Sequence, residues 1–230
     1  MSAVFSDIRH ADLILDQGIN FRFIQSSDTT SYAPLLSFST ARDLIKYLQQ
    51  QPLNHSVMLV SSGMPSILLP ENIPFQETNF PAFLPYQYFC HHLKEYSVNI
   101  HFTISKELNF FLEHTITDFK VIHESELLLN YWKNHNNVLF AGFSGNVVSL
   151  FLKSADGIVA YDQLVYQSAE DVLYFLLYFA KNLQIDPSLA KLMVSGDISL
   201  ESALCRSLSV YFKALEYVAT LPHEASVVEY

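Results

Sequence analysis

The sequence predicts an α/β fold made of two similar halves, each with a mixed sheet flanked by helices. Short apolar stretches alternate with stretches of helical periodicity along most of the chain, which is typical of α/β proteins. Each half also contains a helix that opens with a capping box, at Thr40 and at Ser168, followed by a short strand ending in Ser-Gly. Because residues 40–63 and 168–196 repeat this order, we expect an internal duplication.

The first half is expected to span residues 1–134. It should begin with a hairpin that turns at Asp16-Gln17-Gly18, since Asp and Gly favour turns between apolar runs. The helix that opens at Thr40 should end near Pro52, because proline interrupts helical hydrogen bonding. The other elements expected in this half are strands at 57–60, 67–69, 98–104 and 119–122 and helices at 106–114 and 124–133.

The second half is expected to span residues 135–230, after the polar run at 134–137. Residues 172–180 are apolar in every direction, which predicts a central core helix buried all round. The alternative is an interface at which Tyr174 and Tyr178 contact a partner. The elements expected here are strands at 138–143, 147–152, 158–166 and 192–194 and helices at 168–183 and 200–212.

Residues 70–89 combine closely spaced prolines with many aromatic side chains. Proline disfavours a regular helix or a central strand, so we expect an irregular segment. Exposed aromatic loops commonly bind partners. We therefore predict a partner interface at Phe75, Phe80, Phe83, Tyr86 and Tyr88.

The composition excludes several classes of function. A formal net charge of −10 argues against nucleic-acid binding, which depends on clustered cations. The six glycines are scattered, unlike those of glycine-rich phosphate loops. The longest apolar run, 172–180, is too short to cross a membrane, and residues 1–7 lack the pattern of a signal peptide. We expect a cytoplasmic protein with no membrane span and with reduced cysteines.

Three stretches carry a resemblance to a known family: Ile67-Leu68-Leu69-Pro70 with the aromatic segment after it, Tyr161 through Phe179, and Leu192-Met193-Val194-Ser195-Gly196. The chain resembles a small uncharacterised bacterial family with an actin-like ATPase (ribonuclease H-like) fold. That family is similar to the pilus-assembly and cell-division actin homologues. The resemblance implies two halves that each open with a D-x-G turn, whose carboxylate places Mg²⁺ or water and whose glycine lets backbone N–H groups reach phosphate. It also implies a Gly-Gly turn that supports adenosine.

The positions that match this pattern are the candidate nucleotide-binding residues. In the first half, Asp16 and Gly18 have the expected spacing, although D-x-G is also common in ordinary hairpins. In the second half, the corresponding turn contains Gly142, Ser144 and Gly145 but no carboxylate, and Ser195-Gly196 stands where Gly-Gly is expected.

These departures predict a degenerate site. We therefore expect a non-catalytic protein-interaction or scaffold module with no cofactor, an unidentified protein partner and the option of a homodimer. The alternative is an actin-like ATPase, with weak activity, that binds Mg-ATP in the cleft between the two halves.

Other possible catalytic or metal-binding motifs in the sequence are weaker. The turn at Ser144 approaches the G-x-S-x-G of serine hydrolases, but a strand rather than a helix should follow it. Three consecutive residues, Cys90-His91-His92, would point apart on a helix, so we expect structural histidines and no metal site there. A metal-dependent enzyme that uses His91 and His92 is a third, distant alternative. The remaining histidines show no paired spacing. We assign the acidic pairs Glu124/Glu126 and Glu170/Asp171 to helix starts, where negative charge is favourable.

Overall fold

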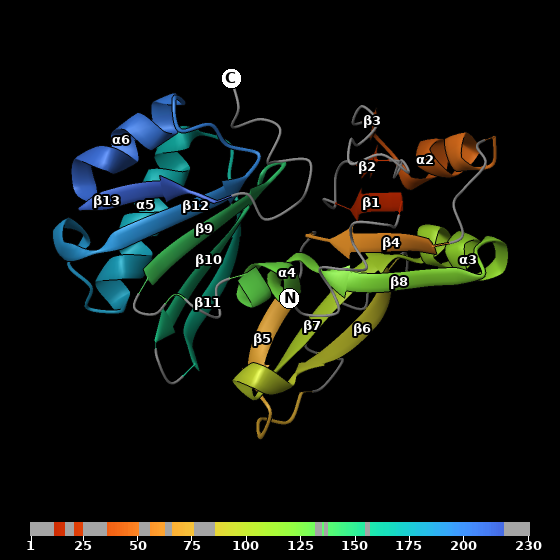
Figure 1. Cartoon of the computed structure of the whole chain (residues 1–230), viewed down its shortest axis with the longest axis horizontal. Helices are drawn as coiled ribbons and strands as arrows, with labels where there is room; N and C mark the ends of the chain where they lie inside the picture. The colour runs from red at the N-terminus through yellow and green to blue at the C-terminus, as the bar shows by residue number, and fades with distance from the viewer. Residues whose placement is uncertain are drawn as a thin grey trace. The chain divides into compact units, whose positions relative to one another are not determined.

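The structure of the protein is a computed structural model (Figure 1). It describes residues 12–16, 21–24, 36–50, 56–62, 66–75, 86–131, 135, 138–154 and 157–218. The chain divides into two compact units, residues 1–130 and 131–230. No helix in the described ranges has both the length and the apolar character that crossing a membrane requires. The cytoplasmic location stays a prediction.

The main sheet of the first unit has five strands in the order β3-β2-β1-β4-β8. β1 pairs antiparallel with β2 and parallel with β4, and β4 pairs parallel with β8. The predicted hairpin is therefore present, and the parallel strands put their carboxyl ends at one edge. The strands are β1 (Asp12–Asp16), β2 (Phe21–Ile24), β3 (Leu36–Phe38), β4 (Ser56–Ser61) and β8 (Asp118–His123).

A second, smaller sheet in this unit has the order β5-β7-β6, and both of its pairings are antiparallel. Its strands are β5 (Ser66–Pro70), β6 (Tyr86–Leu93) and β7 (Val98–Ser105), with the 3-10 helix η2 (Lys94–Tyr96) between the last two. The helices of the unit are α2 (Ala41–Leu48), α3 (Lys106–Thr115) and α4 (Glu124–Tyr131).

One apolar core joins these elements of the first unit. Leu44 and Leu48 of α2 and Leu108 of α3 are buried against side chains from both sheets, including Ile14 and Phe102. The cap predicted at Thr40 is present: its Oγ1 accepts a hydrogen bond from the Asp43 N–H at 3.1 Å and donates one to the Asp43 carboxylate at 2.8 Å. The predicted cap therefore begins the helix whose Leu44 and Leu48 face the core.

The second unit contains a five-stranded sheet in the order β11-β10-β9-β12-β13. β9, β10 and β11 form an antiparallel meander, while β12 pairs parallel with β9 and with β13. Helices α5 and α6 contribute to the core against this sheet. The elements are β9 (Val138–Ser144), β10 (Val147–Ser154), β11 (Gly157–Val165), α5 (Ala169–Asn182), η4 (Pro187–Leu189), β12 (Lys191–Gly196), α6 (Ala203–Tyr211) and β13 (Ala214–Tyr217).

The five-stranded sheets of the two units have the same strand order. In each, an antiparallel meander is followed by two parallel strands, and a helix precedes the first of these. The mixed α/β fold predicted from the sequence is confirmed. This shared order is what an internal duplication would produce, and the duplication itself stays a prediction.

Three strands were not expected from the sequence. β3 and β13 contain only three and four residues, too few for an alternating pattern to stand out. β6 corrects the expectation of an irregular segment up to residue 89, because Tyr86 and Tyr88 lie on a regular strand. Pro85 precedes its first residue, a position at which proline removes no hydrogen bond from a strand interior.

Helix α5 also differs from expectation, because it is not buried all round. Val172 and Leu176 are fully buried against the sheet, whereas Tyr174 is 63% exposed and Tyr178 is 50% exposed. The two tyrosine rings stack with centroids 6.0 Å apart. The capping box at Ser168 and Asp171 is present as predicted, with both reciprocal hydrogen bonds formed. The tyrosine ring counts as apolar in a sequence pattern, so the exposed side of the helix could not be distinguished from the buried side. Its hydroxyl nevertheless allows the side chain to face water.

We expect Leu176→Ala to destabilise the protein by about 2–5 kcal/mol, because it opens a cavity against the sheet. Tyr174→Ala is the matched control on the exposed side of the same helix, and its cost should stay near 1 kcal/mol. Urea denaturation followed by circular dichroism measures both. If the two variants lost the same free energy of unfolding, both sides of α5 would be packed.

Candidate functional site

The carboxyl edge of the first unit's main sheet is where the first candidate turn begins. Asp16 is the last residue of β1 and pairs in register with Ser61, the last residue of β4. Ser61 in turn pairs with His123, the last residue of β8. Ligands of open α/β sheets commonly bind beside such strand ends. Asp16 therefore has the predicted position, while Gly18 lies outside the described residues.

His123 is a buried residue at this edge that sequence reasoning did not select. Its Nδ1 accepts a hydrogen bond from the Ser125 N–H at 3.1 Å, which assigns the proton of the neutral ring to Nε2. Complete burial lowers its pKa from 6.5 to about 3, and nearby His91 contributes in the same direction. Within the described parts of the chain, its Nε2 has no hydrogen-bond partner. A lone histidine at the end of a strand carries no signal in sequence, because its burial depends on tertiary packing.

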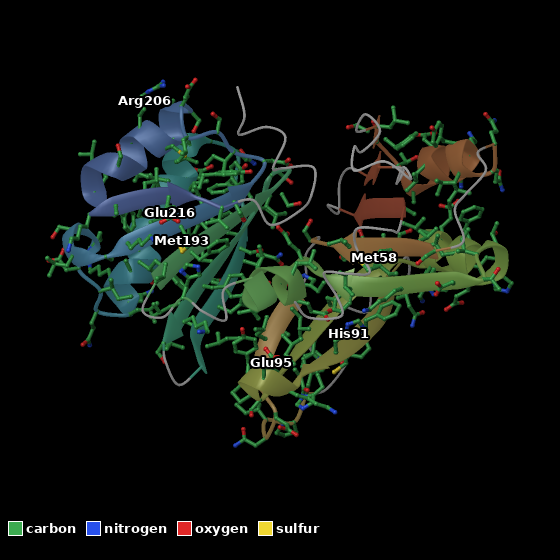
Figure 2. All side chains as sticks on the ribbon, viewed as in Figure 1. Met58, His91, Glu95, Met193, Arg206 and Glu216 are labelled. Carbon is green, nitrogen blue, oxygen red and sulfur yellow. The ribbon has the colours of Figure 1, made fainter. Side chains whose placement is uncertain are left out.

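Glu126 connects this edge to the smaller sheet. Its Oε1 accepts a hydrogen bond from the His123 N–H at 2.9 Å and lies 2.7 Å from Nδ1 of His91 on β6. Glu124 and Glu126 both lie in the first turn of α4, where the sequence placed them. His91 is labelled in Figure 2, which shows it on the small sheet. These contacts connect α4 to β6 and to the end of β8.

The residues Cys90, His91 and His92 lie on a strand and not on the helix assumed from the sequence. His91 is bonded to Glu126, whereas Nδ1 of His92 lies 3.0 Å from Oδ1 of Asn99. Among the residues that the structure describes, no three His, Cys, Asp or Glu side chains are grouped so that they could hold a metal ion.

We expect the buried His123 to make stability depend on pH. Since its pKa is about 3 in the folded protein and 6.5 when unfolded, the unfolded state binds the additional proton between these values. Its contribution is present above pH 6.5 and is lost, by roughly 1 kcal/mol for each pH unit, as the pH falls toward 3. Urea midpoints measured from pH 7 to 4.5 should fall more steeply for the wild type than for His123→Gln.

The control for this measurement is Ser125→Ala, which keeps the backbone N–H that His123 accepts from and should keep the steep slope. Parallel profiles for the wild type and His123→Gln would contradict the assignment of His123 as a neutral buried group.

The second candidate turn joins β9 to β10 through Gly145 and Asn146. Gly145 has a φ of 57°, which favours glycine. The structure brings the second-half candidates together: Gly142 pairs with Ser195 and Phe143 with Gly196 between the parallel strands β9 and β12, and Ser144 ends β9. Ser195 is fully buried, and its hydroxyl has no hydrogen-bond partner among the described residues.

Asp197 supplies a carboxylate to this turn from another strand end. Its Oδ2 accepts a hydrogen bond from the Gly145 N–H at 2.8 Å, and its own N–H donates to the Phe143 carbonyl at 2.9 Å. The Tyr166 hydroxyl donates to the Gly145 carbonyl at 2.9 Å; burial, followed by the charge of Asp197, raises the pKa of Tyr166. The sequence shows Asp197 beside Gly196 but not its approach to Gly145, which depends on strand pairing.

Gly196 allows this close approach. Its φ is 84°, and a Cβ at this position would lie 1.9 Å from the Phe143 carbonyl oxygen. Only glycine combines this backbone conformation with that contact. The single glycine thus allows the end of β12 to lie against the end of β9, which places Asp197 beside the turn after β9.

We expect Gly196→Ala to cost about 3 kcal/mol or more, because it combines a left-handed backbone with a backbone clash. Gly157→Ala is the matched control: Gly157 also has a positive φ, 138°, but nothing lies within 4 Å of the added Cβ. That variant should lose only about 1–3 kcal/mol. Thermal unfolding compares them, and a smaller loss for Gly196→Ala than for Gly157→Ala would show that the close contact is relaxed.

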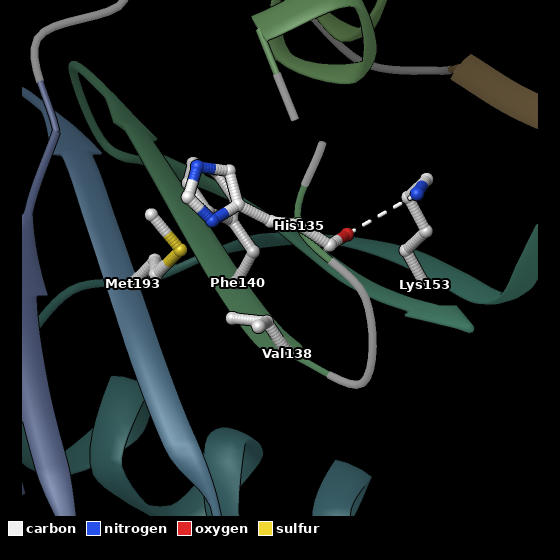
Figure 3. Close-up of a pocket in the computed structure, with 5 residues that line it drawn as sticks. All are labelled: His135, Val138, Phe140, Lys153 and Met193. Carbon is white, nitrogen blue, oxygen red and sulfur yellow. Dashed lines mark hydrogen bonds between the residues drawn. The ribbon is translucent and has the colours of Figure 1, made fainter. Parts of the chain in front are cut away.

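A small pocket in the second unit is lined by His135, Val138, Phe140, Lys153 and Met193 (Figure 3). The Lys153 ammonium donates a hydrogen bond to the His135 carbonyl at 3.1 Å. The volume is about 10 Å³, which suffices for one water molecule. This pocket is therefore too small for a nucleotide.

The predicted aromatic interface is only partly available for binding. The Phe75 ring stacks on His101 with centroids 4.0 Å apart, and the Tyr88 hydroxyl lies 2.6 Å from Nδ1 of His101. Phe75 and Tyr88 thus pack on the small sheet and cover His101, whereas Tyr86 is exposed. Both residues are half-buried, and their part in a partner interface stays a prediction. Phe80 and Phe83 lie outside the described residues.

Residues 76–215 match the family described as Protein of unknown function (DUF3822). The chain belongs to this family. No curated protein matches the chain. Membership of the DUF3822 family confirms the resemblance to an uncharacterised family that the sequence indicated.

Solved structures show which fold this DUF3822 protein has. A Bacteroides thetaiotaomicron protein with an actin-like ATPase fold and unknown function has a TM-score of 0.74 at 16% identity, covering 95% of this chain and 94% of its own. The PilM-PilN type IV pilus biogenesis complex gives 0.53 at 13% identity, with 92% and 88% covered. The ethanolamine utilization protein EutJ from Carboxydothermus hydrogenoformans gives 0.54 at 6% identity, with 94% and 86% covered. The predicted actin-like ATPase fold is confirmed.

Proposed function

We propose that this protein is a non-catalytic protein-interaction or scaffold module built on an actin-like ATPase fold. The observation that carries the proposal is the hydrogen bond from the Gly145 N–H to the Asp197 carboxylate. The resemblance to actin-like ATPases implies that the backbone N–H groups of this turn face a phosphate. In this chain the Gly145 N–H already donates to the Asp197 carboxylate, which is negatively charged as a phosphate is.

Electrostatics make this arrangement unfavourable for a nucleotide. A phosphate would have to replace the hydrogen bond that the Gly145 N–H already makes, which at this exposed position contributes about 1 kcal/mol or less because solvent screens the charge. The phosphate would also approach the negative charge of Asp197, since the carboxylate stays attached to the end of β12. The turn as it stands does not fit a phosphate group, so we derive no chemical step through ATP.

The interaction role is supported by the fold relatives and by the exposed aromatic residues. PilM, a protein of this fold, forms a complex with PilN. Fold alone does not carry function from one protein to another. In this chain, Tyr86, Tyr174 and Tyr178 are exposed aromatic side chains of the kind that form interface anchors.

A second candidate function is an ATP-binding, actin-like ATPase. One observation favours it. The turn between β9 and β10 contains no carboxylate of its own, but the Asp197 carboxylate lies beside it, and Asp16 ends β1 in the first half. In this alternative, Asp16 would hold metal-bound water. The predicted residues Gly18, Gly142, Ser144, Gly145, Ser195 and Gly196 would then line the nucleotide site.

Thermal unfolding with millimolar Mg-ATP or Mg-ADP separates the two functions. Under our proposal, nucleotide leaves the Tm of the wild type unchanged. A ligand at 100 times its Kd would add about 2.7 kcal/mol and would raise the Tm by roughly 5–10 °C for a chain of this size. A Mg-dependent rise that Asp16→Ala removes would establish the ATPase alternative.

Asp197→Ala tests the cause, because it frees the Gly145 N–H. If the carboxylate is the obstacle, this variant gains a response to phosphate or nucleotide that the wild type lacks. Glu201→Ala removes an exposed carboxylate a few residues further along the chain and serves as the charge-matched control. Loss of an existing nucleotide response in Asp197→Ala would show that Asp197 assists binding.

A further inference from the structure

A row of polar residues crosses the sheet of the second unit. Strand pairing sets Ser195 of β12 beside Gly142 of β9, and Gly142 beside Ser149 of β10. Ser149 in turn pairs with Gln163 of β11. Residues paired in this way point to the same face of a sheet. Val194, the neighbour of Ser195 in β12, packs in the core with α5 and α6, so this polar row lies on the opposite face.

The polar row is buried. Ser195 is 0% exposed, Ser149 is 1% exposed and Gln163 is 8% exposed. The adjacent row contains Met193 and Phe140, which pair with each other, are labelled in Figure 3 and are each 1% exposed. A buried hydroxyl costs free energy unless it is hydrogen-bonded. Polar side chains beside such apolar neighbours therefore need partners.

The hydrogen bonds of the polar row are incomplete within the described structure. Nε2 of Gln163 donates to the Ser149 hydroxyl at 3.3 Å. A serine hydroxyl can donate one hydrogen bond and accept two, so accepting this bond leaves Ser149 with a proton to donate. The Ser195 hydroxyl has no hydrogen-bond partner among the described residues. These two hydroxyls flank the position of Gly142.

Gly142 leaves room between them. It lies inside β9 and is not among the described residues with a positive φ, so its backbone conformation does not require glycine. Glycine in a strand interior often marks a place where another group comes close to the backbone. The strands on either side of β9 lie about 9–10 Å apart, too far for Ser195 and Ser149 to bond directly. The missing side chain thus leaves space for a small polar molecule.

We propose that ordered water lies over Gly142 and connects the Ser195 hydroxyl to the Ser149–Gln163 pair. Buried water typically makes about three hydrogen bonds to polar groups that need a partner. A neutral molecule fits because the polar row contains no charged side chain that could compensate a buried ion. The inference goes beyond the proposed function, since this water requires neither a nucleotide nor another protein.

A crystal structure of the full chain, without nucleotide and at a resolution that shows ordered water, tests the site directly. A water should lie within about 2.7–3.2 Å of the Ser195 Oγ. The proposal is wrong if that atom is bonded to another protein group or to a larger molecule, or if no water lies beside it.

Two substitutions at Gly142 test the site in solution. Gly142→Ala should displace the water and lower the Tm by roughly 2–4 °C, because Ser195 then loses its partner. Gly142→Ser should recover part of this loss, since its hydroxyl takes the place of the water. If crowding alone mattered, serine, which is larger than alanine, would lose at least as much. A serine variant no more stable than the alanine variant, or a rise in Tm for Gly142→Ala, contradicts the proposal.

Ser195→Ala shows whether the buried hydroxyl is bound to water. With water bound, the variant loses a hydrogen bond, and its Tm should fall by roughly 2–4 °C. Removing a hydroxyl that has no partner would instead leave the Tm unchanged or raise it, which overturns the proposal. The advantage of Gly142→Ser over Gly142→Ala should also disappear when Ser195→Ala is added, because the two positions then share no hydrogen bond. An advantage that persists in full contradicts the link to Ser195, whatever the nucleotide experiment shows.

Discussion

The parallel pairing of β12 with β9 is the constraint on which the second unit depends. It aligns Gly196 with Phe143, and the positive φ of Gly196 lets the chain pass against the Phe143 carbonyl. Asp197 then reaches the turn between β9 and β10 and accepts the Gly145 N–H. The strand register, the tight turn and the charge at the candidate site therefore follow from one close contact between two backbones, which no other residue type would allow.

The sequence predicts the elements whose signals are local. The caps at Thr40 and Ser168, the hairpin around Asp16 and the turn at Gly145 are set by neighbouring residues, and all are present in the structure. Helix α5 was misjudged because Tyr174 and Tyr178 count as apolar in a pattern although both are exposed. β6 was missed because the prolines before it suggested an irregular segment, whereas the pairing that forms it comes from β7.

The candidate site shows the same division. Gly142, Gly145 and Gly196 could be selected from the sequence because a glycine at a turn indicates a backbone conformation or a close contact that other residues rarely allow. The role of Asp197 could not, since 52 positions separate it from Gly145 and only the pairing of β9 with β12 brings them together. His123 likewise becomes unusual only because its burial at the end of β8 lowers its pKa. Long-range contacts determine which ordinary residues become chemically distinctive.

Pro70 has a consequence for one edge of the small sheet. β5 lies at an edge of this sheet in the described structure, and Pro70 is its last residue. Proline has no N–H to donate to a ladder, and it is confined to positions where none is needed. A further strand added at the end of β5 would therefore find one donor fewer than an ordinary strand offers, which disfavours extension of the sheet there.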